Sequence, residues 1–311
     1  EIGQGSDTTW AMITAEVLGI PLDLVRVFSG DTDYSVDLGA YSSRQTLMTG
    51  AAVRIAAEDV KRQVLQSLSN EFRVEMEMLG IQDGYIVFKN PGIDFSHIRR
   101  RYLAEHRGWT DNPEGERLTF REAARIAFLS RGTIVGRGKY RPAVLGGKHK
   151  GAAVGTSPAY GCSAQITEVR VDLETGQIFV EKMTDAHDCG LAINKTSVEG
   201  QMQGSLHMGL GETLMEEVKF DAKGKILNAN LGEYKIATAL DTPNVNAIIV
   251  ESREPYGPFG AKEVGEGAIM PTIPAILNAV YDATGVRIRE LPLTPERVLK
   301  ALQAAKQDKQ S

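Results

Sequence analysis

The sequence predicts an α+β fold made of two packed units, each of which mixes sheet and helix. Helical and strand patterns follow one another along the 311 residues without the regular alternation of a parallel α/β sheet. Turn signals between neighbouring strand patterns indicate antiparallel hairpins. A loop rich in Gly and Lys interrupts both patterns between residues 140 and 160. We therefore assign residues 1–140 to the first unit and residues 141–311 to the second.

Composition and charge argue against two classes of partner. The chain has 35 Lys and Arg against 40 Asp and Glu, so it lacks a broad basic surface for nucleic acid. No apolar run approaches the roughly 20 residues that span a bilayer, and no signal peptide is recognisable. Cys162 and Cys189 are too few for a disulfide framework, which favours a reducing cytoplasm. Because Glu1 already opens a Gly-rich motif, we interpret the chain as part of a larger unit, processed or divided among chains.

The first unit combines helices with a hairpin. Its apolar and turn patterns predict, in order, a helix between residues 5 and 19, a strand at 24–28, a helix from 45 to 68, strands at 74–78 and 85–88 joined through Asp83-Gly84, and a helix at 123–129. Ser6 or Asp7 is the expected cap of the first helix, and Gly19 its end. Thr119 and Glu122 fit a capping box before the last helix.

The second unit carries the longer strands. The patterns predict strands at 162–171 and 177–183 with a turn at 172–176, a helix at 198–215, a hairpin at 218–227, a strand at 245–251, a helix in the apolar run 268–280, and a helix at 295–305. Gly200, Gly204, Gly209 and Gly211 interrupt the helix at 198–215, at about 1 kcal/mol each relative to Ala. They indicate close approach of this helix to another element or to a ligand. The charged stretch at 90–117, with its arginine run, is interpreted as a solvated face.

The stretch at residues 257–267 is the strongest candidate for chemistry. It reads Gly-Pro-Phe-Gly-Ala-Lys-Glu-Val-Gly-Glu-Gly and combines glycines with Lys262, Glu263 and Glu266 ahead of a helix. Glycines let a backbone pass close to a ligand, and a carboxylate on such a loop can be held against a reacting atom. A Gly-rich loop with solvated charges explains this stretch alone equally well.

Three further loops offer polar groups at helix starts. Gly3, Gln4 and Gly5 precede exposed N–H groups and hydroxyls, which is typical of an anion cradle, although neither a P-loop nor a complete dinucleotide fingerprint is present. Residues 41–45 add two hydroxyls, a guanidinium and a carboxamide, and by themselves they favour an ordinary helix cap with a surface arginine. Residues 199–204 add amides on a Gly-rich helix start. His187 and Cys189 lack a second pair at metal-ligand spacing and are expected to be packed residues.

Taken in order, these segments resemble a known family. Residues 1–8, 39–44, 171–176, 198–204 and 257–267 are similar to the C-terminal half of the large subunit in the xanthine oxidase family of molybdenum hydroxylases. The resemblance runs from Glu1 to about Leu302. Within this family, the sequence of residues 41–44, 148–160 and 257–263 is most similar to the 4-hydroxybenzoyl-CoA reductase branch.

The resemblance implies a cofactor and a site. The cofactor is molybdopterin, in the cytosine dinucleotide form, lying between two halves of the large subunit. Its dithiolene holds the molybdenum, so no protein metal ligand is expected. The residues that match cofactor-contacting positions are Gly3, Gln4, Gly5, Ser42, Ser43, Arg44, Gln45, Gln201 and Gly204. Glu266 matches the active-site base, and Glu263 is the competing carboxylate.

The resemblance also implies partners, because the N-terminal half of the cofactor cleft is missing. We expect a second chain that carries this half, an iron–sulfur subunit with 2Fe–2S clusters, and a flavin subunit with FAD. The expected substrate is an aromatic or N-heterocyclic compound, with aryl-CoA thioesters among the candidates, and the reaction could add or remove a ring hydroxyl. Two other interpretations stay open: a non-catalytic cofactor-binding or assembly module, and an unrelated anion-binding α+β domain. Glu266 and the polar loops favour the enzyme, because a scaffold has no need of a base.

Overall fold

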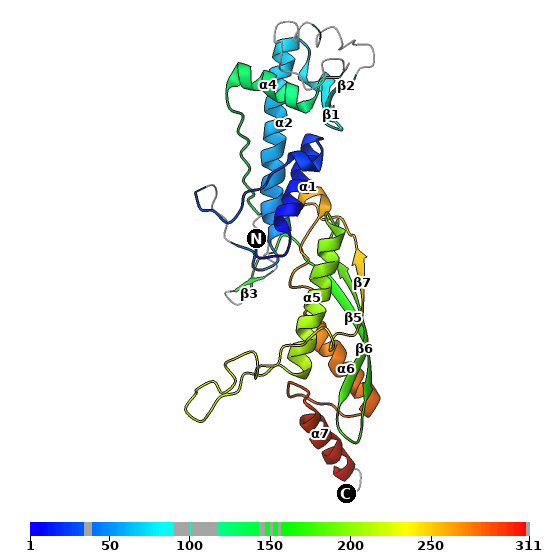
Figure 1. The fold of residues 1–311 in the computed structure, drawn as a ribbon. Helices are drawn as coiled ribbons and strands as arrows, with labels where there is room; N and C mark the ends of the chain where they lie inside the picture. The colour runs from blue at the N-terminus through cyan, green and yellow to red at the C-terminus, as the bar shows by residue number, and fades with distance from the viewer. Residues whose placement is uncertain are drawn as a thin grey trace. The chain divides into compact units, whose positions relative to one another are not determined.

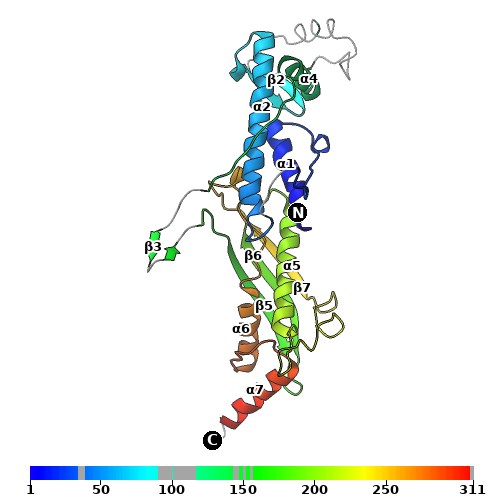
Figure 2. The same cartoon turned by 90° about the vertical axis from the view of Figure 1, so that its left-hand side faces the viewer.

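The computed structural model describes residues 1–33, 39–89, 100, 117–142, 147–149, 152–154 and 157–308 (Figures 1 and 2). The chain divides into two compact units. Unit 1 comprises Glu1–Ala40, Arg44–Pro158 and Tyr256–Pro258, and unit 2 comprises Tyr41–Ser43, Ala159–Pro255 and Phe259–Ser311. Both units contain helix and sheet, which confirms the predicted α+β class. The predicted charged stretch at 90–117 lies almost entirely outside the described residues.

Unit 1 is built on helices and two short hairpins. Its elements are α1 (Ser6–Leu18), η1 (Leu22–Leu24), η2 (Gln45–Thr49, a π-helix), α2 (Gly50–Phe72), η3 (Met76–Met78), β1 (Leu79–Gln82), β2 (Tyr85–Phe88), α4 (Phe120–Arg131), β3 (Gly147–His149) and β4 (Ala152–Val154). β1 pairs with β2 and β3 with β4, both antiparallel. The 23-residue helix α2 packs against α1 and α4 and is the element on which the unit is assembled.

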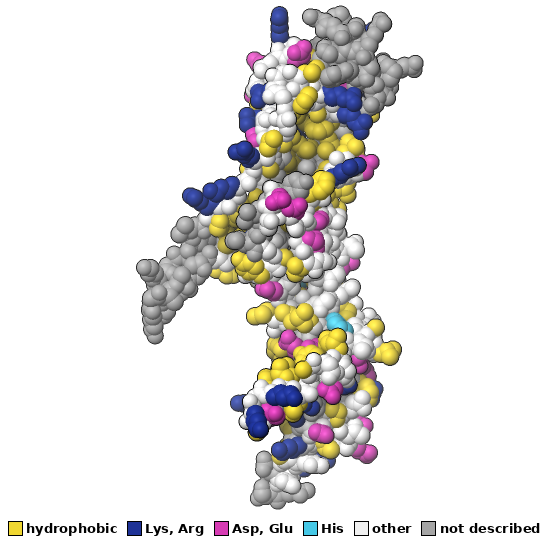
Figure 3. All heavy atoms as spheres, turned by 60° about the vertical axis from the view of Figure 1, so that its left-hand side comes forward, with side chains coloured by type: hydrophobic (Ala, Val, Ile, Leu, Met, Phe, Trp, Pro, Cys, Tyr) yellow, Lys and Arg dark blue, Asp and Glu magenta, His cyan; other side chains and the backbone are white. Residues whose placement is uncertain are grey.

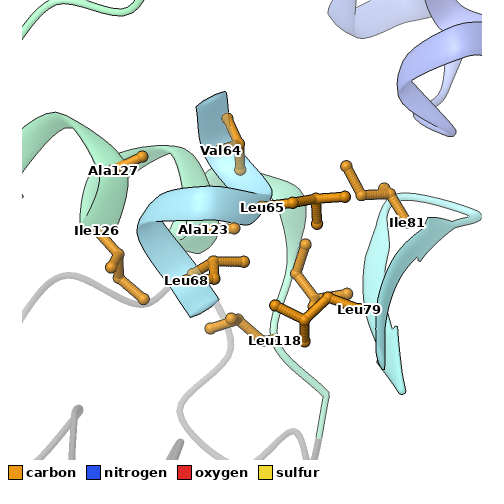
Figure 4. Close-up of a cluster of buried hydrophobic side chains, with 10 residues drawn as sticks. Val64, Leu65, Leu68, Leu79, Ile81, Leu118, Ala123, Ile126 and Ala127 are labelled. Carbon is orange, nitrogen blue, oxygen red and sulfur yellow. The ribbon is translucent and has the colours of Figure 1, made fainter. Parts of the chain in front are cut away.

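One apolar core joins the far end of α2 to the β1–β2 hairpin and α4 (Figure 4). Its buried side chains are Val64, Leu65, Leu68, Leu79, Ile81, Ile86, Leu118, Ala123, Ile126 and Ala127. The predicted capping box fixes the start of α4: Thr119 Oγ1 accepts from the Glu122 N–H at 3.2 Å, and the Glu122 carboxylate accepts from the Thr119 N–H at 2.8 Å. This satisfies two N–H groups that the first turn would otherwise leave without partners.

Two predicted strands of unit 1 are wrong in place. The strand predicted at 24–28 is absent from the described residues: Leu24 lies in the 3-10 turn Leu22–Leu24, and residues 25–28 form no strand. The strand predicted at 74–78 begins later, at Leu79, after the turn Met76–Met78. Its register follows from the Asp83-Gly84 turn, where φ is positive at both residues, so that Gln82 must pair with Tyr85.

Unit 2 contains a three-stranded sheet with helices on its apolar face. Its elements are β5 (Cys162–Val171), β6 (Ile178–Asp188), α5 (Lys195–Leu214), β7 (Asn244–Val250), α6 (Thr272–Thr284) and α7 (Pro295–Asp308). The short η4 (Pro258–Gly260) precedes the last two helices, and its first residue belongs to unit 1. The strand order is β5-β6-β7: β5 pairs antiparallel with β6, and β6 pairs parallel with β7. α5 lies along this sheet in both views (Figures 1 and 2). The core beneath it contains Met183, Leu206, Leu210, Ile276, Val280, Leu293, Val298 and Leu302.

Most elements of unit 2 agree with the prediction. β5 has the predicted bounds, and the returning strand β6 continues past Met183 to Asp188. Helix α5 begins three residues early, at Lys195, because Asn194 caps it by accepting from the Ser197 N–H at 3.2 Å. The hairpin predicted at 218–227 is reduced to a single bridge between Phe220 and Ile226.

The surface of the chain mixes apolar and charged side chains (Figure 3). Exposed apolar side chains on the segment between α5 and β7 include Phe220, Leu231 and Leu240. No helix in the described part of the chain is both long enough and apolar enough to cross a membrane. Both cysteines are free thiols, with Cys162 exposed and Cys189 buried. Burial raises the pKa of the Cys189 thiol to about 11.

Candidate active site

The loop between β7 and α6 carries the candidate base, and a distant segment of chain holds it. Glu266 is exposed, and its Oε1 accepts a hydrogen bond from the Ser42 N–H at 3.2 Å. The Glu266 N–H donates to Ser43 Oγ at 2.7 Å. Tyr41–Ser43 thus belongs to unit 2 although the neighbouring residues belong to unit 1. The structure brings Ser42, Ser43 and Glu266 together, and we call residues 261–271 the Glu266 loop.

Ser42 and Ser43 have an uncommon backbone conformation. Their φ values are 56° and 49°, two successive left-handed residues without a glycine. Each such residue costs on the order of 1–3 kcal/mol, and residues of this kind cluster at ligand and active sites. Here the conformation directs one N–H and one hydroxyl to the same residue, Glu266. The strain therefore serves a specific contact.

A buried ion pair anchors the start of the Glu266 loop. Lys262 Nζ lies 2.7 Å from Asp188 Oδ2 and also donates to the Tyr160 carbonyl at 2.7 Å. Asp188 further accepts from the Ser252 hydroxyl and from the N–H groups of Ser252 and Gly190. Although burial opposes it, these donors, Lys262 first, hold the pKa of Asp188 well below its usual range. The loop is therefore fixed to the end of β6.

Helix α5 holds the loop from a second side. Ser205 Oγ donates to the Gly265 carbonyl at 3.0 Å. The predicted cofactor residues Gln201 and Gly204 lie on the same helix, Gln201 one turn before Ser205 and the exposed Gly204 directly before it. A Cβ on Gly204 would meet no atom within 4 Å, whereas one on Gly209 would lie 2.6 Å from Thr272. Close packing thus explains the glycine at 209, and the glycine at 204 faces open space.

Glu263 lies on the same loop but is largely enclosed. Burial raises the pKa of its carboxyl group, and the nearby Glu266 adds to the rise, while His187, a hydrogen bond from Ser43 and Lys262 oppose it. His187 is fully buried, and its Nε2 lies 3.4 Å from the Glu263 carbonyl oxygen. The two carboxyl groups of the loop therefore differ, one exposed and one enclosed.

In unit 1, the predicted anion cradle holds a carboxylate of the chain itself. Glu1 Oε1 accepts from the N–H groups of Gly3 (2.7 Å) and Gly5 (3.1 Å), and Oε2 accepts from Ser6 Oγ (2.9 Å) and the Asp7 N–H (3.1 Å). Burial opposes these bonds, and together they lower the pKa of Glu1 to about 2. The predicted side-chain caps, Ser6 and Asp7, are wrong, since Gly5 is the N-cap with φ 85°. The Glu1 carboxylate, which precedes the helix, accepts from N–H groups at the helix start and so replaces a side-chain cap.

The other predicted residues of unit 1 lie at or close to helix starts. The Gln4 amide nitrogen is buried without a hydrogen-bond partner among the described residues. Arg44 precedes the π-helix η2, whose first residue, Gln45, is buried. Single π turns of this kind are often found at functional sites. The predicted set is thus split: Gly3, Gln4, Gly5, Arg44 and Gln45 belong to unit 1, and Ser42, Ser43, Gln201, Gly204 and Glu266 to unit 2.

Sequence reasoning missed the residues that hold the loop. Ser205 and the Lys262–Asp188 pair were not predicted, and His187 was expected only to be packed. One signal was present: polar residues alternate along β5 and β6 on the face that otherwise forms the core. An alternation that places Asp185 and His187 inside a core is costly, and this cost marks the end of the sheet as a candidate functional site.

Comparison with known proteins places the chain in a family. Residues 1–243 match the molybdopterin cofactor-binding domain family. Among curated proteins, the putative xanthine dehydrogenase molybdenum-binding subunit XdhA of Escherichia coli K12 is 32% identical over 98% of this chain and 37% of its own length. The carbon monoxide dehydrogenase large chain of Hydrogenophaga pseudoflava is 29% identical over 96% of this chain and 34% of its own.

Solved structures show the same relationship. Quinoline 2-oxidoreductase from Pseudomonas putida 86 superposes with a TM-score of 0.78 at 27% identity, over 97% of this chain and 36% of that one. The chain thus spans a little over a third of the proteins it matches.

Proposed function

Since the chain belongs to the molybdopterin cofactor-binding family and is the C-terminal part of a xanthine oxidase-type molybdenum-binding subunit, we propose that it forms one side of the active site of a molybdenum hydroxylase or dehydrogenase. In this proposal Glu266 is the active-site base. The observation that carries the proposal is the way Glu266 is held: exposed, on an anchored loop, with Oε1 bonded to the Ser42 N–H and its own N–H bonded to Ser43.

The geometry fits the work of a general base. A base has to reach the proton that it removes and must be held in place while it does so. The Ser42 N–H engages Oε1, which leaves Oε2 as the atom that takes the proton. Lys262, paired with Asp188, and Ser205 anchor the loop that carries Glu266 at two points. When bound, the cofactor supplies the metal and accepts the electrons that the substrate loses.

The residues present fit a phosphate-bearing pterin. In unit 1 the N–H groups of Gly3, Gly5 and Asp7 already hold a carboxylate, the chemistry needed for a phosphate of the cytosine dinucleotide form. The buried Gln4 amide offers an unused donor for the same cofactor. We propose Gly3, Gln4, Gly5, Ser42, Ser43, Arg44, Gln45, Gln201 and Gly204 as the residues that would hold it.

We propose an aromatic or N-heterocyclic compound as the substrate, with aryl-CoA thioesters among the candidates. Relatives named quinoline 2-oxidoreductase and nicotine 6-hydroxylase large subunit support the N-heterocyclic class. The aryl-CoA class is supported by residues 41–44 and 257–263, whose sequence is similar to the 4-hydroxybenzoyl-CoA reductase branch. Turnover assays with both classes decide between them.

The proposed partners are a polypeptide with the N-terminal part of the molybdenum subunit, an iron–sulfur subunit with 2Fe–2S clusters, and a flavin subunit with FAD. The support is that this chain spans a little over a third of its relatives' length. The cysteine count keeps the cytoplasm as the proposed compartment.

Metal analysis and native mass spectrometry on the complex purified from its source test the proposal. We expect about one molybdenum per copy of this chain, together with iron and the partner polypeptides. Glu266→Gln should keep the metal and the partners but lower kcat by at least 10²-fold, because an amide cannot accept the proton. A metal-free chain that purifies alone, or normal turnover in Glu266→Gln, would support a non-catalytic binding module instead.

A further inference from the structure

The core face of the sheet in unit 2 changes from apolar to polar along its length. Away from the Glu266 loop, it is formed by Val169, Val171, Ile178, Val180 and Met183, which join the apolar core. Toward the loop, the strand register places five polar side chains on the same face: Ser163, Gln165, Thr167, Asp185 and His187. We call these five residues the polar patch. Asp185 and His187 are fully buried. Buried polar groups cost free energy, and departures of this kind from an apolar core are typical of functional sites.

The Glu266 loop lies directly on the polar patch. The Gln165 side-chain amide donates to the Ala268 carbonyl, and His187 Nε2 lies 3.4 Å from the Glu263 carbonyl. Between them, a Cβ on Gly267 would lie 2.6 Å from His187 Cε1 and 3.1 Å from Glu263 Oε1. Side chains of the polar patch therefore contact the segment from Glu263 to Ala268 at both of its ends: His187 at Glu263, and Gln165 at Ala268.

The Glu263 side chain continues this support toward Glu266. The Ser43 hydroxyl is one of the groups that lower the pKa of the Glu263 carboxyl group, so the two side chains are neighbours. Ser43 Oγ in turn accepts from the Glu266 N–H at 2.7 Å, and it lies 3.0 Å from the position of a Cβ on Gly265. A hydroxyl has one donor and can accept at the same time, so Ser43 can connect the two glutamates.

Charge and burial agree with a supporting role for Glu263. His187 lies among acidic groups, with Asp185 on its own strand and Glu263 on the loop, and Lys262 is engaged with Asp188. Burial raises the pKa of Asp185 as it does that of Glu263. An enclosed carboxyl group is poorly placed to meet a substrate, but a carboxyl group beside Ser43 can accept from its hydroxyl.

We propose that Glu263 and Ser43 are positioning residues for Glu266. In this arrangement the Glu263 carboxyl group accepts a hydrogen bond from the Ser43 hydroxyl. Ser43 Oγ in turn accepts from the backbone N–H of Glu266. The proposal rests on the proposed function of Glu266 as the base. In this proposal the Ser43 side chain contacts the Glu266 loop, and the Ser43 backbone contacts the cofactor.

The Glu266 loop needs such support because Gly265 and Gly267 flank the base and give the backbone wide freedom. A displacement of about 1 Å at a catalytic group can cost on the order of 10²-fold in rate. Loss of the Ser43 or Glu263 contact should therefore reduce turnover without changing substrate binding.

The test uses four variants in the complex purified from its source: Ser43→Ala, Glu263→Ala, Glu263→Gln and, as a matched control, Glu174→Gln, an exposed residue in the β5–β6 turn. We expect Ser43→Ala and Glu263→Ala to lower kcat about 10- to 100-fold, with KM and molybdenum content within about 3-fold of wild type. Glu263→Gln keeps an acceptor for Ser43 and should stay within about 3-fold of the wild-type kcat. Glu174→Gln should match wild type.

Three results would overturn the proposal: wild-type kcat in Glu263→Ala, equal impairment in Glu263→Gln and Glu263→Ala, or molybdenum loss in Ser43→Ala that matches its loss of activity. The second result would make Glu263 itself a base or a required charge. If Ser43→Ala does not assemble, the two Glu263 variants decide alone. An active Glu266→Gln would refute the proposed function, whereas an inactive Glu266→Gln beside fully active Ser43→Ala and Glu263→Ala would refute only this inference.

Discussion

Lys262 Nζ and Asp188 Oδ2 are 2.7 Å apart, in an ion pair whose side chains are only 7% and 17% exposed. Removing one partner of a buried pair leaves the other charge uncompensated, at about 3–5 kcal/mol. We expect Lys262→Met to lower the free energy of unfolding of unit 2 by about that amount, measured by denaturant titration or hydrogen exchange. The control is Lys182→Met, whose pair with Glu168 is exposed and should contribute less than about 1 kcal/mol. Equal effects in the two variants would contradict the anchor.

Acid should weaken the same anchor. The folded pKa of Asp188 is depressed, so its contribution is complete above the unfolded value of about 3.9 and is lost as the pH falls toward the folded value. The stability difference between wild type and Asp188→Asn should therefore shrink between about pH 5 and pH 2. Glu1, Asp185 and Glu263 titrate in both proteins, so their contributions to stability cancel when the variant is subtracted from wild type. A difference that stays constant over this range would show that Asp188 is not the group responsible.

Gly267→Ala tests the contact between the Glu266 loop and the polar patch. The added Cβ would lie 2.6 Å from His187 Cε1, so either the ring or the loop has to move. We expect a loss of about 1–3 kcal/mol in stability, as for other overpacked sites, and a kcat at least 10-fold lower because Glu266 moves with the loop. Circular-dichroism melting and steady-state kinetics measure the two effects. Unchanged kcat in a correctly loaded complex would show that the loop position does not matter.

Gly200→Ala and Gly204→Ala form a matched pair on one face of α5. Neither added Cβ meets an atom within 4 Å, so each should stabilise the helix by about 0.5–1 kcal/mol through reduced backbone entropy. Gly204→Ala alone should also lower molybdenum occupancy, because we propose close approach of the cofactor there. Thermal unfolding and metal analysis of both variants provide the readouts. Equal molybdenum content in the two would remove Gly204 from the cofactor site.

The sequence predicted what depends on local chemistry. The alternation of Cys162–Val171 set the bounds of β5, and the Thr119–Glu122 pair set the start of α4, because both patterns act within a few residues. The family resemblance then assigned roles to loops that pattern alone left undecided.

What escaped prediction depends on contacts between distant residues. The residue types of Ser42 and Ser43 do not predict two successive left-handed residues. The contacts that accompany this conformation come from a loop more than 220 positions away in the sequence. The parallel pairing of β7 with β6, and the capture of the Gly3–Asp7 N–H groups by Glu1, are likewise choices of the folded chain.

The two thiols of the chain differ enough to make one of them a selective handle. Cys189 is buried with a pKa of about 11, so it has almost no thiolate at neutral pH, whereas Cys162 is exposed. A maleimide fluorophore or spin label should therefore attach at one defined place, the first residue of β5. That residue follows Gly161, where an added Cβ would overlap the Glu263 carboxylate. The native chain thus accepts a spectroscopic reporter beside its own Glu266 loop, without any engineered cysteine.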